Sequence, residues 1–236
     1  MPVIHKCEPR SAEWFALRLG IPTASEFHRI LTPKTLKVSS QAPAYMHRLL
    51  GEWITGEQVE NYQSEFMVRG QELEDQAISA FELLTDIETS PGNFVTTDDG
   101  WLGCSPDRLI GDDSDLEIKC PLIQGAVGYA LNGLSEEHVC QVQGRLMIEE
   151  RDSVYVFAYH PRLSIPPLKV FRDERFISIM RPVLQQFVET MLACRVSLEQ
   201  RFGPFPRPQP EARPNADELG VSDEDVDAII AAQVKL

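Results

Sequence analysis

The sequence lacks a long apolar run. No stretch approaches the roughly 18 consecutive apolar residues that suggest a membrane-spanning helix, and residues 1–10 carry no apolar segment of the kind that signal peptides have. This pattern argues against a membrane protein and against a secreted protein. We therefore expect a soluble protein of the cytoplasm.

Paired cysteines are also missing. The five cysteines are odd in number, and no two stand close together at a metal-ligand spacing. We predict that all of them are reduced thiols that pack in the interior. One of them lies beside candidate catalytic residues, but no histidine pattern supplies the base that a nucleophilic cysteine needs, so we assign it to packing as well. The five are Cys7, Cys104, Cys120, Cys140 and Cys194.

Basic residues are scarce, with 22 Lys and Arg against 36 Asp and Glu, and the net charge is −14. This balance argues against a protein that coats nucleic acid through a broad basic surface. If the protein binds DNA, it must do so through a local concentration of arginine and lysine, assisted by a bound metal ion that offsets the acidic side chains.

What is present is an ordinary globular composition, 43% hydrophobic and 25% charged over 236 residues. This length is enough for one well-filled core, and we expect one domain over residues 1–203. Five prolines between residues 204 and 214 then indicate a stiff linker. An acidic segment with a short apolar stripe follows and is typical of a helix that begins at Ser222. Residues 204–236 therefore form a tail, which is frayed, docked on its own body, or bound to a partner.

The first third of the chain has helical periodicity. Thr23 to Glu26 has the form of a capping box, so we predict a helix that begins at Thr23 and ends before Pro33. Residues 32–38 indicate an exposed basic loop. Apolar spacing then predicts helices over about 42–54 and 64–84.

The middle of the chain changes to the period of strands. Turn signals separate short stretches that we interpret as a meander of sheet, and helix and strand patterns alternate after it. The order predicts an α/β fold of mixed α+β type, with a central mixed β-sheet flanked by helices. The predicted strands cover 93–97, 101–104, 107–110, 115–119, 154–159 and 168–171, and the predicted helices cover about 136–148 and, capped by Asp173, 174–198.

A pattern with chemical meaning joins Ser105-Pro106-Asp107 to Glu117-Ile118-Lys119. Along a strand over 115–119, Glu117 and Lys119 project from one face, while Ile118 points into the core. Asp107 starts the preceding strand and lies beside Glu117. Two adjacent carboxylates indicate an oxygen-ligated divalent cation, which phosphodiester hydrolysis requires. The alternative for this spacing alone is a hairpin with a surface ion pair.

Seven short segments resemble the phage lambda exonuclease family, which includes the YqaJ-like viral recombinases and the alkaline exonucleases. They occur in the family's order, with similar gaps, from about residue 11 to residue 195. The segments are Trp14 to Gly20, Thr23 to Glu26, Gly70 with Glu74, Cys104 to Asp107, Leu116 to Pro121, Gln141 to Gln143 and Tyr159 to Arg162. The resemblance implies a restriction-endonuclease-like fold of the PD-(D/E)xK superfamily.

The resemblance also implies roles for individual residues. Asp107, Glu117 and Glu74 match the family's metal-binding carboxylates, and the carbonyl of Ile118 matches a backbone ligand. Lys119 matches its catalytic lysine. Two Mg²⁺ ions are implied, for which Mn²⁺ substitutes.

Further matches concern the DNA. Gln141 matches an active-site glutamine. A pocket for the 5′-terminal phosphate is implied, and a guanidinium with two hydroxyl donors suits it chemically. Its alternatives are a helix-surface ion pair for the arginine and an ordinary helix-start donor for the serine of the capping box. The residues that match the pocket are Arg18, Ser25 and Ser105. Met67 stands at the family's strand-separating wedge or, alternatively, is a core methionine, and Lys34 and Lys37 correspond to its basic loop.

The implied activity is digestion of one strand of linear double-stranded DNA from a 5′-phosphorylated end, which leaves a 3′ overhang for recombination. The family also implies a homotrimeric ring around DNA and a partner that anneals single strands, in a bacterial cell or a phage-infected host. Two alternatives stay open, because the carboxylates and the lysine do not encode end preference. They are a site-specific or repair endonuclease on the same fold and a non-catalytic DNA-binding subunit.

Overall fold

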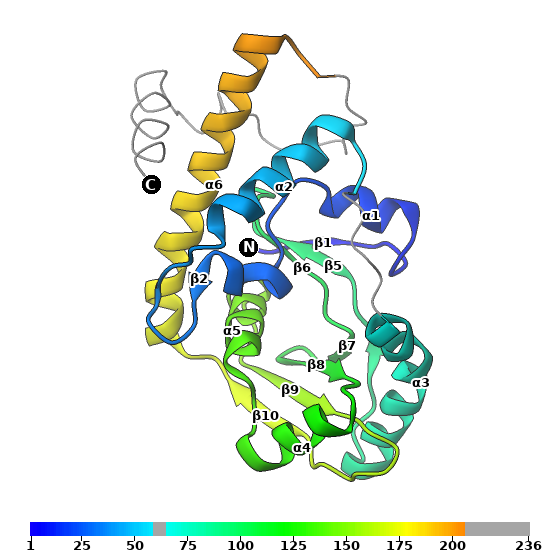
Figure 1. Cartoon of the computed structure of the whole chain (residues 1–236). Coiled ribbons are helices and arrows are strands. Elements are labelled where there is room, and N and C mark those ends of the chain that lie inside the picture. Colours follow the sequence, from blue (N-terminus) through cyan, green and yellow to red (C-terminus); the bar gives the residue numbers. More distant parts are fainter. Residues whose placement is uncertain (59–64, 206–236) are drawn as a thin grey trace.

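The computed structural model describes the backbone of residues 1–58 and 65–205, and all side chains in these ranges except those of residues 65–68, 70 and 71. Figure 1 shows two parts that meet at helix α5. One contains α1, α2 and a small sheet, and the other contains α3, α4 and the larger sheet. The helices are α1 (Ala12–Arg18), the 3-10 helix η1 (Ala24–Arg29), α2 (Ala42–Thr55), α3 (Glu65–Thr85), α4 (Ile123–Asn132), α5 (Glu136–Glu149) and α6 (Glu174–Phe202).

The larger sheet is mixed. Its five strands lie in the order β10-β9-β8-β7-β4, and only the β8–β9 pair is parallel. Because parallel neighbours need a crossover, α4 and α5 connect these two strands. The strands are β4 (Ser90–Pro91), β7 (Arg108–Ile110), β8 (Ser114–Lys119), β9 (Ser153–Ala158) and β10 (Leu168–Phe171).

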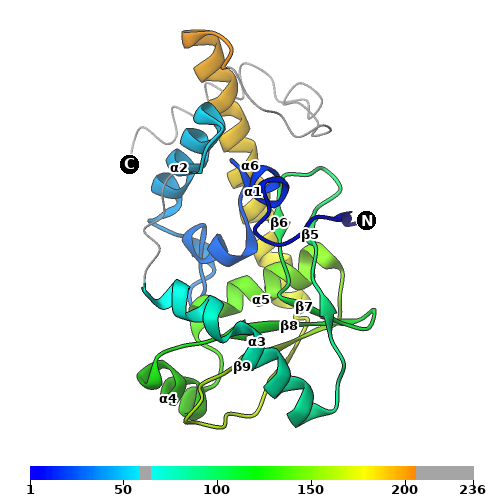
Figure 2. The ribbon, with the colours of Figure 1, turned by 90° about the vertical axis from the view of Figure 1, so that its right-hand side faces the viewer.

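Helices cover both faces of this sheet. On one face, Ala77 and Phe81 of α3 pack against Leu116 and Phe157. On the other face, two apolar residues of α5, Val142 and Leu146, pack against Val154 and Val156 of β9. Figure 2 shows α3 and α5 beside the same strands. The predicted mixed sheet with flanking helices is therefore confirmed.

The smaller sheet has the strand order β1-β5-β6 and is antiparallel. The prediction of one continuous meander is therefore wrong, because β5 and β6 pair with β1 while β7 and β8 belong to the larger sheet. Local periodicity indicates strands but not their partners, and strands of two or three residues carry little pairing information. The bounds are β1 (Val3–His5), β5 (Phe94–Thr96) and β6 (Gly103–Cys104).

The predicted helix from Thr23 is shorter than expected. The Thr23 hydroxyl lies 3.3 Å from Ser25 Oγ and does not cap the helix. Only one 3-10 segment forms, because Leu31 then pairs with Val38 in a two-stranded hairpin of β2 (Leu31–Thr32) and β3 (Lys37–Val38). The basic loop is thus the turn of a hairpin.

The other long helices are confirmed within two residues, apart from the end of α6. Asp173 caps that helix as predicted, because its side chain accepts from the backbone N–H groups of Arg175 and Phe176, and the helix continues to Phe202. The predicted tail helix lies outside the described residues, so the division at residue 203 stays a prediction. No helix in the described ranges is long and apolar enough to cross a membrane.

Candidate active site

One face of β8 and one face of α5 carry polar side chains that meet in the interior. Two residues along a strand advance about 6.6 Å, and four residues along a helix advance about 6 Å, so the two spacings match. Asp115, Glu117 and Lys119 of β8 therefore stand opposite residues of α5 at every fourth position. We call this set of six residues the polar ladder; its α5 members are Gln141, Arg145 and Glu149.

Lys119 and Gln141 form the open end of the ladder. Lys119 Nζ lies 2.7 Å from Glu117 Oε1 and donates to Gln141 Oε1 at 3.0 Å. The amide nitrogen of Gln141 donates to the same Glu117 oxygen at 2.7 Å. Burial disfavours the charged form of Glu117, but Lys119 and Arg145 together hold its pKa below the usual value. Glu117 is thus an ionised carboxylate with a fixed orientation.

Arg145 occupies the middle of the ladder and is 1% exposed. Its guanidinium lies 2.8 Å from Asp115 Oδ1 and contacts Glu117 Oε2 directly. Glu149 lies 3.9 Å away. Although burial disfavours a charged guanidinium, the surrounding carboxylates raise the pKa of Arg145. The prediction missed Arg145, Asp115 and Glu149; the i, i+4 spacing from Gln141 was the available signal.

Asp107 lies just before β7, and the neighbouring strand fixes its position. Its Oδ2 accepts from the backbone N–H of Ile118 at 2.6 Å. Burial, followed by the charge of Glu117, raises the pKa of Asp107 to about 7. No lysine, arginine or histidine in the described ranges forms an ion pair with Asp107. Among the described residues of the site, Asp107 is therefore a carboxyl group without an ion-pair partner.

Glu74 reaches the site from α3. Its Oε2 accepts from Arg10 Nη2 at 2.8 Å, and both side chains are partly exposed. Among the described residues, no three Asp, Glu, His or Cys side chains converge closely enough to hold one ion as they stand. Arg10 engages one carboxylate oxygen of Glu74 in this arrangement.

A pocket of about 230 Å³ joins these carboxylates to a second group of side chains. We divide the lining residues by their chemistry into two groups, which we call the walls of the pocket. The first wall consists of Glu74, Asp107, Glu117, Gln141 and Arg145. The second wall includes the three residues assigned to a 5′-phosphate, namely Arg18, Ser25 and Ser105. The structure thus brings together seven of the residues expected at the site, and Lys119 joins them through its contacts with Glu117 and Gln141.

The second wall is built by a junction of short elements. Thr23 forms a parallel bridge with Gly103, which brings η1 next to β6 and Ser25 to the same wall as Ser105. The indole Nε1 of Trp14 donates to Ser105 Oγ at 3.2 Å. The Arg18 guanidinium lies over the Trp14 ring, 4.2 Å from its centroid.

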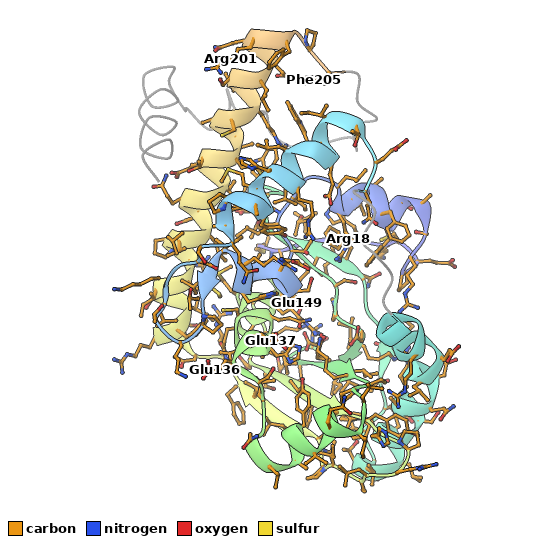
Figure 3. All side chains as sticks on the ribbon, viewed as in Figure 1. Arg18, Glu136, Glu137, Glu149, Arg201 and Phe205 are labelled. Atoms are coloured by element: carbon orange, nitrogen blue, oxygen red, sulfur yellow. The ribbon has the colours of Figure 1, made fainter. Side chains whose placement is uncertain are left out.

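Arg18 lies at the end of α1 (Figure 3). Desolvation lowers the pKa of its guanidinium. In the described part of the chain, no carboxylate forms an ion pair with Arg18, so the alternative of a surface ion pair is not what the structure has. The group is a partly desolvated cation, stacked on an aromatic ring, that faces a pocket.

Other predicted residues lie elsewhere. Lys34 Nζ lies 3.3 Å from Glu136 Oε1 and is well exposed, and Lys37 begins β3; neither lines the pocket. Met67 is on α3, but its side chain lies outside the described residues. Cys120 packs against the α3 face of the sheet, where burial raises the pKa of its thiol to about 11. All five cysteines are free, and Cys7, Cys104 and Cys140 are buried as predicted, whereas Cys120 and Cys194 are only partly buried.

The residues of the first wall fit a divalent cation. Asp107 and Glu117 supply hard oxygen donors, which Mg²⁺ prefers. Asp107 forms no ion pair in the described ranges, and burial, followed by the charge of Glu117, raises its pKa. Lys119 and Arg145 are both engaged by Glu117. A metal ion between the two carboxylates would remove the remaining repulsion.

Comparison with known proteins agrees with this site. The model of the YqaJ-like viral recombinase domain matches residues 13–152, a span that contains every residue assigned to the site. The chain belongs to this family. The resemblance to the lambda exonuclease family is thereby confirmed. No match was found among curated proteins.

Solved structures give the same answer. The alkaline exonuclease LHK-Exo from Laribacter hongkongensis is 26% identical to this chain, with a TM-score of 0.72 over 81% of this chain and 97% of that chain. The structure of LHK-Exo in complex with dAMP has 27% sequence identity and a TM-score of 0.73, again over 81% of this chain and 97% of that chain. A phage-related exonuclease from Haemophilus somnus 129PT is 13% identical, with a TM-score of 0.56 over 74% of this chain and 96% of that chain. At this low identity, the likeness shows the fold alone. The fold is restriction-endonuclease-like, and the family supports a nuclease role with DNA as the substrate.

Proposed function

We propose that this protein is a Mg²⁺-dependent 5′-to-3′ exonuclease. It digests one strand of linear duplex DNA from a 5′-phosphorylated end and leaves a 3′ single-stranded overhang for recombination by strand annealing. One observation carries the proposal: a single pocket is lined by a partly desolvated arginine and two serines on one wall and by carboxylates on the other. Such a pocket suits an anion at one side and hydrolysis at the other.

In this proposal, Asp107, Glu117 and the Ile118 carbonyl hold one Mg²⁺, and Glu74 holds a second. When bound, the ions polarise the phosphoryl group, lower the pKa of a bound water and neutralise the departing oxygen. Glu117 is already fixed by Lys119, Gln141 and Arg145. Asp107 is fixed by the backbone of Ile118.

The chain's own groups have separate tasks. Lys119 Nζ orients the attacking water by donating to it as an ammonium, or accepts a proton from it as the free amine. The amide oxygen of Gln141 holds Nζ in place. Arg18, Ser25 and Ser105 bind the terminal phosphate, because a guanidinium fork with hydroxyl donors recognises phosphate oxygens. The aromatic support of Trp14 keeps the fork directed into the pocket.

End recognition follows from the proximity of the two walls. A terminal phosphate held by Arg18 leaves the next phosphodiester near the carboxylates, so hydrolysis releases a mononucleotide. The similar protein LHK-Exo was solved in complex with dAMP, a mononucleotide, which agrees with a mononucleotide product here. An internal site of a closed duplex presents no terminal phosphate to Arg18, which disfavours an endonuclease.

Assembly belongs to the proposal as well. A homotrimeric ring would retain DNA by enclosing it, which suits a protein with a net charge of −14. A single-strand annealing protein would receive the overhang. Light scattering tests the first point, and a strictly monomeric protein at working concentration would remove the ring from the account.

The test of the activity is time-resolved digestion of linear duplexes labelled at either terminus, with and without Mg²⁺. We expect early release of the 5′ label, late release of the 3′ label and no release without the metal. Covalently closed circles serve as the control. Cleavage of circles would support an endonuclease instead, and binding without cleavage in either Mg²⁺ or Ca²⁺ would support a non-catalytic subunit.

A further inference from the structure

Arg145 lies in the most deeply buried charged cluster that the structure describes, and the proposed reaction does not use it. Its side chain is 1% exposed, Asp115 is 0% exposed, and Glu117 and Glu149 are each under 9% exposed. One guanidinium therefore faces three carboxylates. A charged group at such a position is costly unless it is paired and held in a fixed geometry.

The geometry of Arg145 links two carboxylates that have different surroundings. Nη2 pairs with Asp115 at 2.8 Å, and Nη1 pairs with Glu117. Asp115 does not line the pocket, whereas Glu117 does. Arg145 thus anchors a pocket carboxylate to a fully buried one. The planar fork of arginine suits this task, because its donors keep a fixed angle to one another, and a lysine ammonium cannot reproduce it.

The contacts of Glu117 are divided between its two oxygens. Oε1 receives Lys119 Nζ and the Gln141 amide, and Oε2 receives Arg145. Lys119 is partly exposed, with 23% of its side chain accessible, and belongs to the reacting end of the site. Arg145 is the buried contact, and its side chain is 1% exposed.

We infer that Arg145 is a positioning residue, which holds Glu117 in its ligand orientation before any divalent ion binds. This inference rests on the proposed role of Glu117 as a metal ligand. Arg145 acts through Glu117 and needs no contact with DNA. It makes the first wall of the pocket a rigid, preformed site, and its loss would weaken metal binding more than DNA binding.

The test measures Mn²⁺ binding to the full chain without DNA, by calorimetry, in a double-mutant cycle. The variants are Arg145→Lys, Glu117→Gln and their combination. We expect Arg145→Lys to weaken Mn²⁺ binding about tenfold, as changes to groups behind a metal ligand do. The combined variant should bind no more weakly than Glu117→Gln alone, because both changes remove the same oriented carboxylate.

A second readout separates positioning from general damage. In Arg145→Lys, the Mg²⁺ concentration for half-maximal hydrolysis should rise about tenfold, while the KM for 5′-phosphorylated DNA stays within about twofold. Arg151→Gln is the matched control. Arg151 donates to the carbonyls of Ser114 and Gly111 near the start of β8. In the described ranges it forms no ion pair with Asp115 or Glu117, so Arg151→Gln should leave Mn²⁺ binding unchanged.

The outcomes separate the role of Glu117 as a metal ligand from the role of Arg145 as a positioning residue. Wild-type Mn²⁺ binding by Glu117→Gln would overturn the ligand assignment and, with it, this inference. Weakened binding by Glu117→Gln together with wild-type binding by Arg145→Lys, or additive effects in the cycle, would overturn the positioning role alone. If Arg145→Lys does not fold, the double variant Arg145→Gln/Asp115→Asn removes the buried pair as a unit and replaces it in the same cycle.

Discussion

The two walls of the pocket are built in opposite ways. In the first wall, which we now call the carboxylate wall, the charge of Glu117 is paired within the site, since Glu117 contacts Lys119, Gln141 and Arg145 at once. The second wall, which we now call the phosphate wall after its proposed ligand, has no such pairing. No described carboxylate forms an ion pair with Arg18, which stacks on the ring of Trp14. Glu117 is thus neutralised by its own neighbours, whereas Asp107 of the same wall has no ion pair in the described ranges. The other wall presents a cation to the pocket.

This difference indicates which kind of ligand each wall would bind. An internally paired carboxylate keeps its geometry without a ligand, so it can receive a metal ion with little rearrangement. A partly desolvated arginine without a carboxylate gains most from an anion that replaces its lost hydration. In the proposed function, the anion and the metal ions bind in one pocket, so the short distance between them would couple recognition of an end to hydrolysis.

The largest effect should come from the carboxylate wall. Lys119→Ala removes the ammonium between Glu117 and Gln141 and should lower turnover on linear duplex by at least about 10²-fold, the usual scale for a proton-transfer group. Binding of 5′-phosphorylated DNA in Ca²⁺ should stay near the wild-type value. Lys169→Ala, on β10, is the control for loss of a lysine. Near-normal turnover by Lys119→Ala would remove Lys119 from the mechanism.

Gly92→Ala should affect the same wall indirectly. A Cβ at this position would lie 1.9 Å from the carbonyl oxygen of Pro106, so the backbone that carries Asp107 must move. We expect a loss of about 1–3 kcal/mol in the free energy of unfolding and a clear fall in turnover. Thermal unfolding and kinetics measure the two effects. Gly128→Ala has free space and should do neither; equal behaviour of the two variants would contradict this role for Gly92.

Effects on the phosphate wall should be smaller for a single hydroxyl. Ser105→Ala removes one donor to the proposed phosphate and the acceptor of the Trp14 indole. One such hydrogen bond contributes about 1 kcal/mol, so the KM for 5′-phosphorylated ends should rise about fivefold. The KM for 5′-hydroxyl ends should change little. An equal rise for both ends would assign Ser105 to packing rather than to phosphate.

The smallest effect should come from Cys120. This residue follows Lys119 directly, but its thiol packs against the α3 face and does not line the pocket. Cys120→Ala should therefore keep turnover within about twofold, with a modest loss of stability from the small cavity. Steady-state kinetics check this expectation. A loss comparable with that of Lys119→Ala would restore a catalytic role for the thiol.

The carboxylate wall was predictable to the extent that it is local. Strand alternation placed Glu117 and Lys119 on one face, and the α5 pattern placed Gln141 on a helix. Arg145 was not predicted as a site residue, because a charged residue on an amphipathic helix is ordinarily solvated. Its burial depends on Asp115, and only the match between helix and strand spacing reveals that pair.

Contacts between residues far apart in the chain could not be predicted from local sequence patterns. Arg10 and Glu74 are 64 residues apart, and no local pattern links them. The division of the middle strands between two sheets was missed for the same reason, since β5 pairs with β1 across most of the first hundred residues. For the phosphate wall, the resemblance supplied the residues, and the bridge between Thr23 and Gly103 shows how the fold brings them together.

The central claim is that one pocket recognises a 5′-phosphate and hydrolyses the next phosphodiester. The most direct measurement compares kcat/KM for linear duplexes with a 5′-phosphate or a 5′-hydroxyl end, in the wild type and in Arg18→Ala. We expect the wild type to prefer the phosphate at least tenfold, as the loss of a charge-assisted contact of about 1.5–3 kcal/mol implies. Arg18→Ala should lose that preference and keep its rate on the hydroxyl end. Equal rates on both ends in the wild type, or an unchanged preference in Arg18→Ala, would contradict the account.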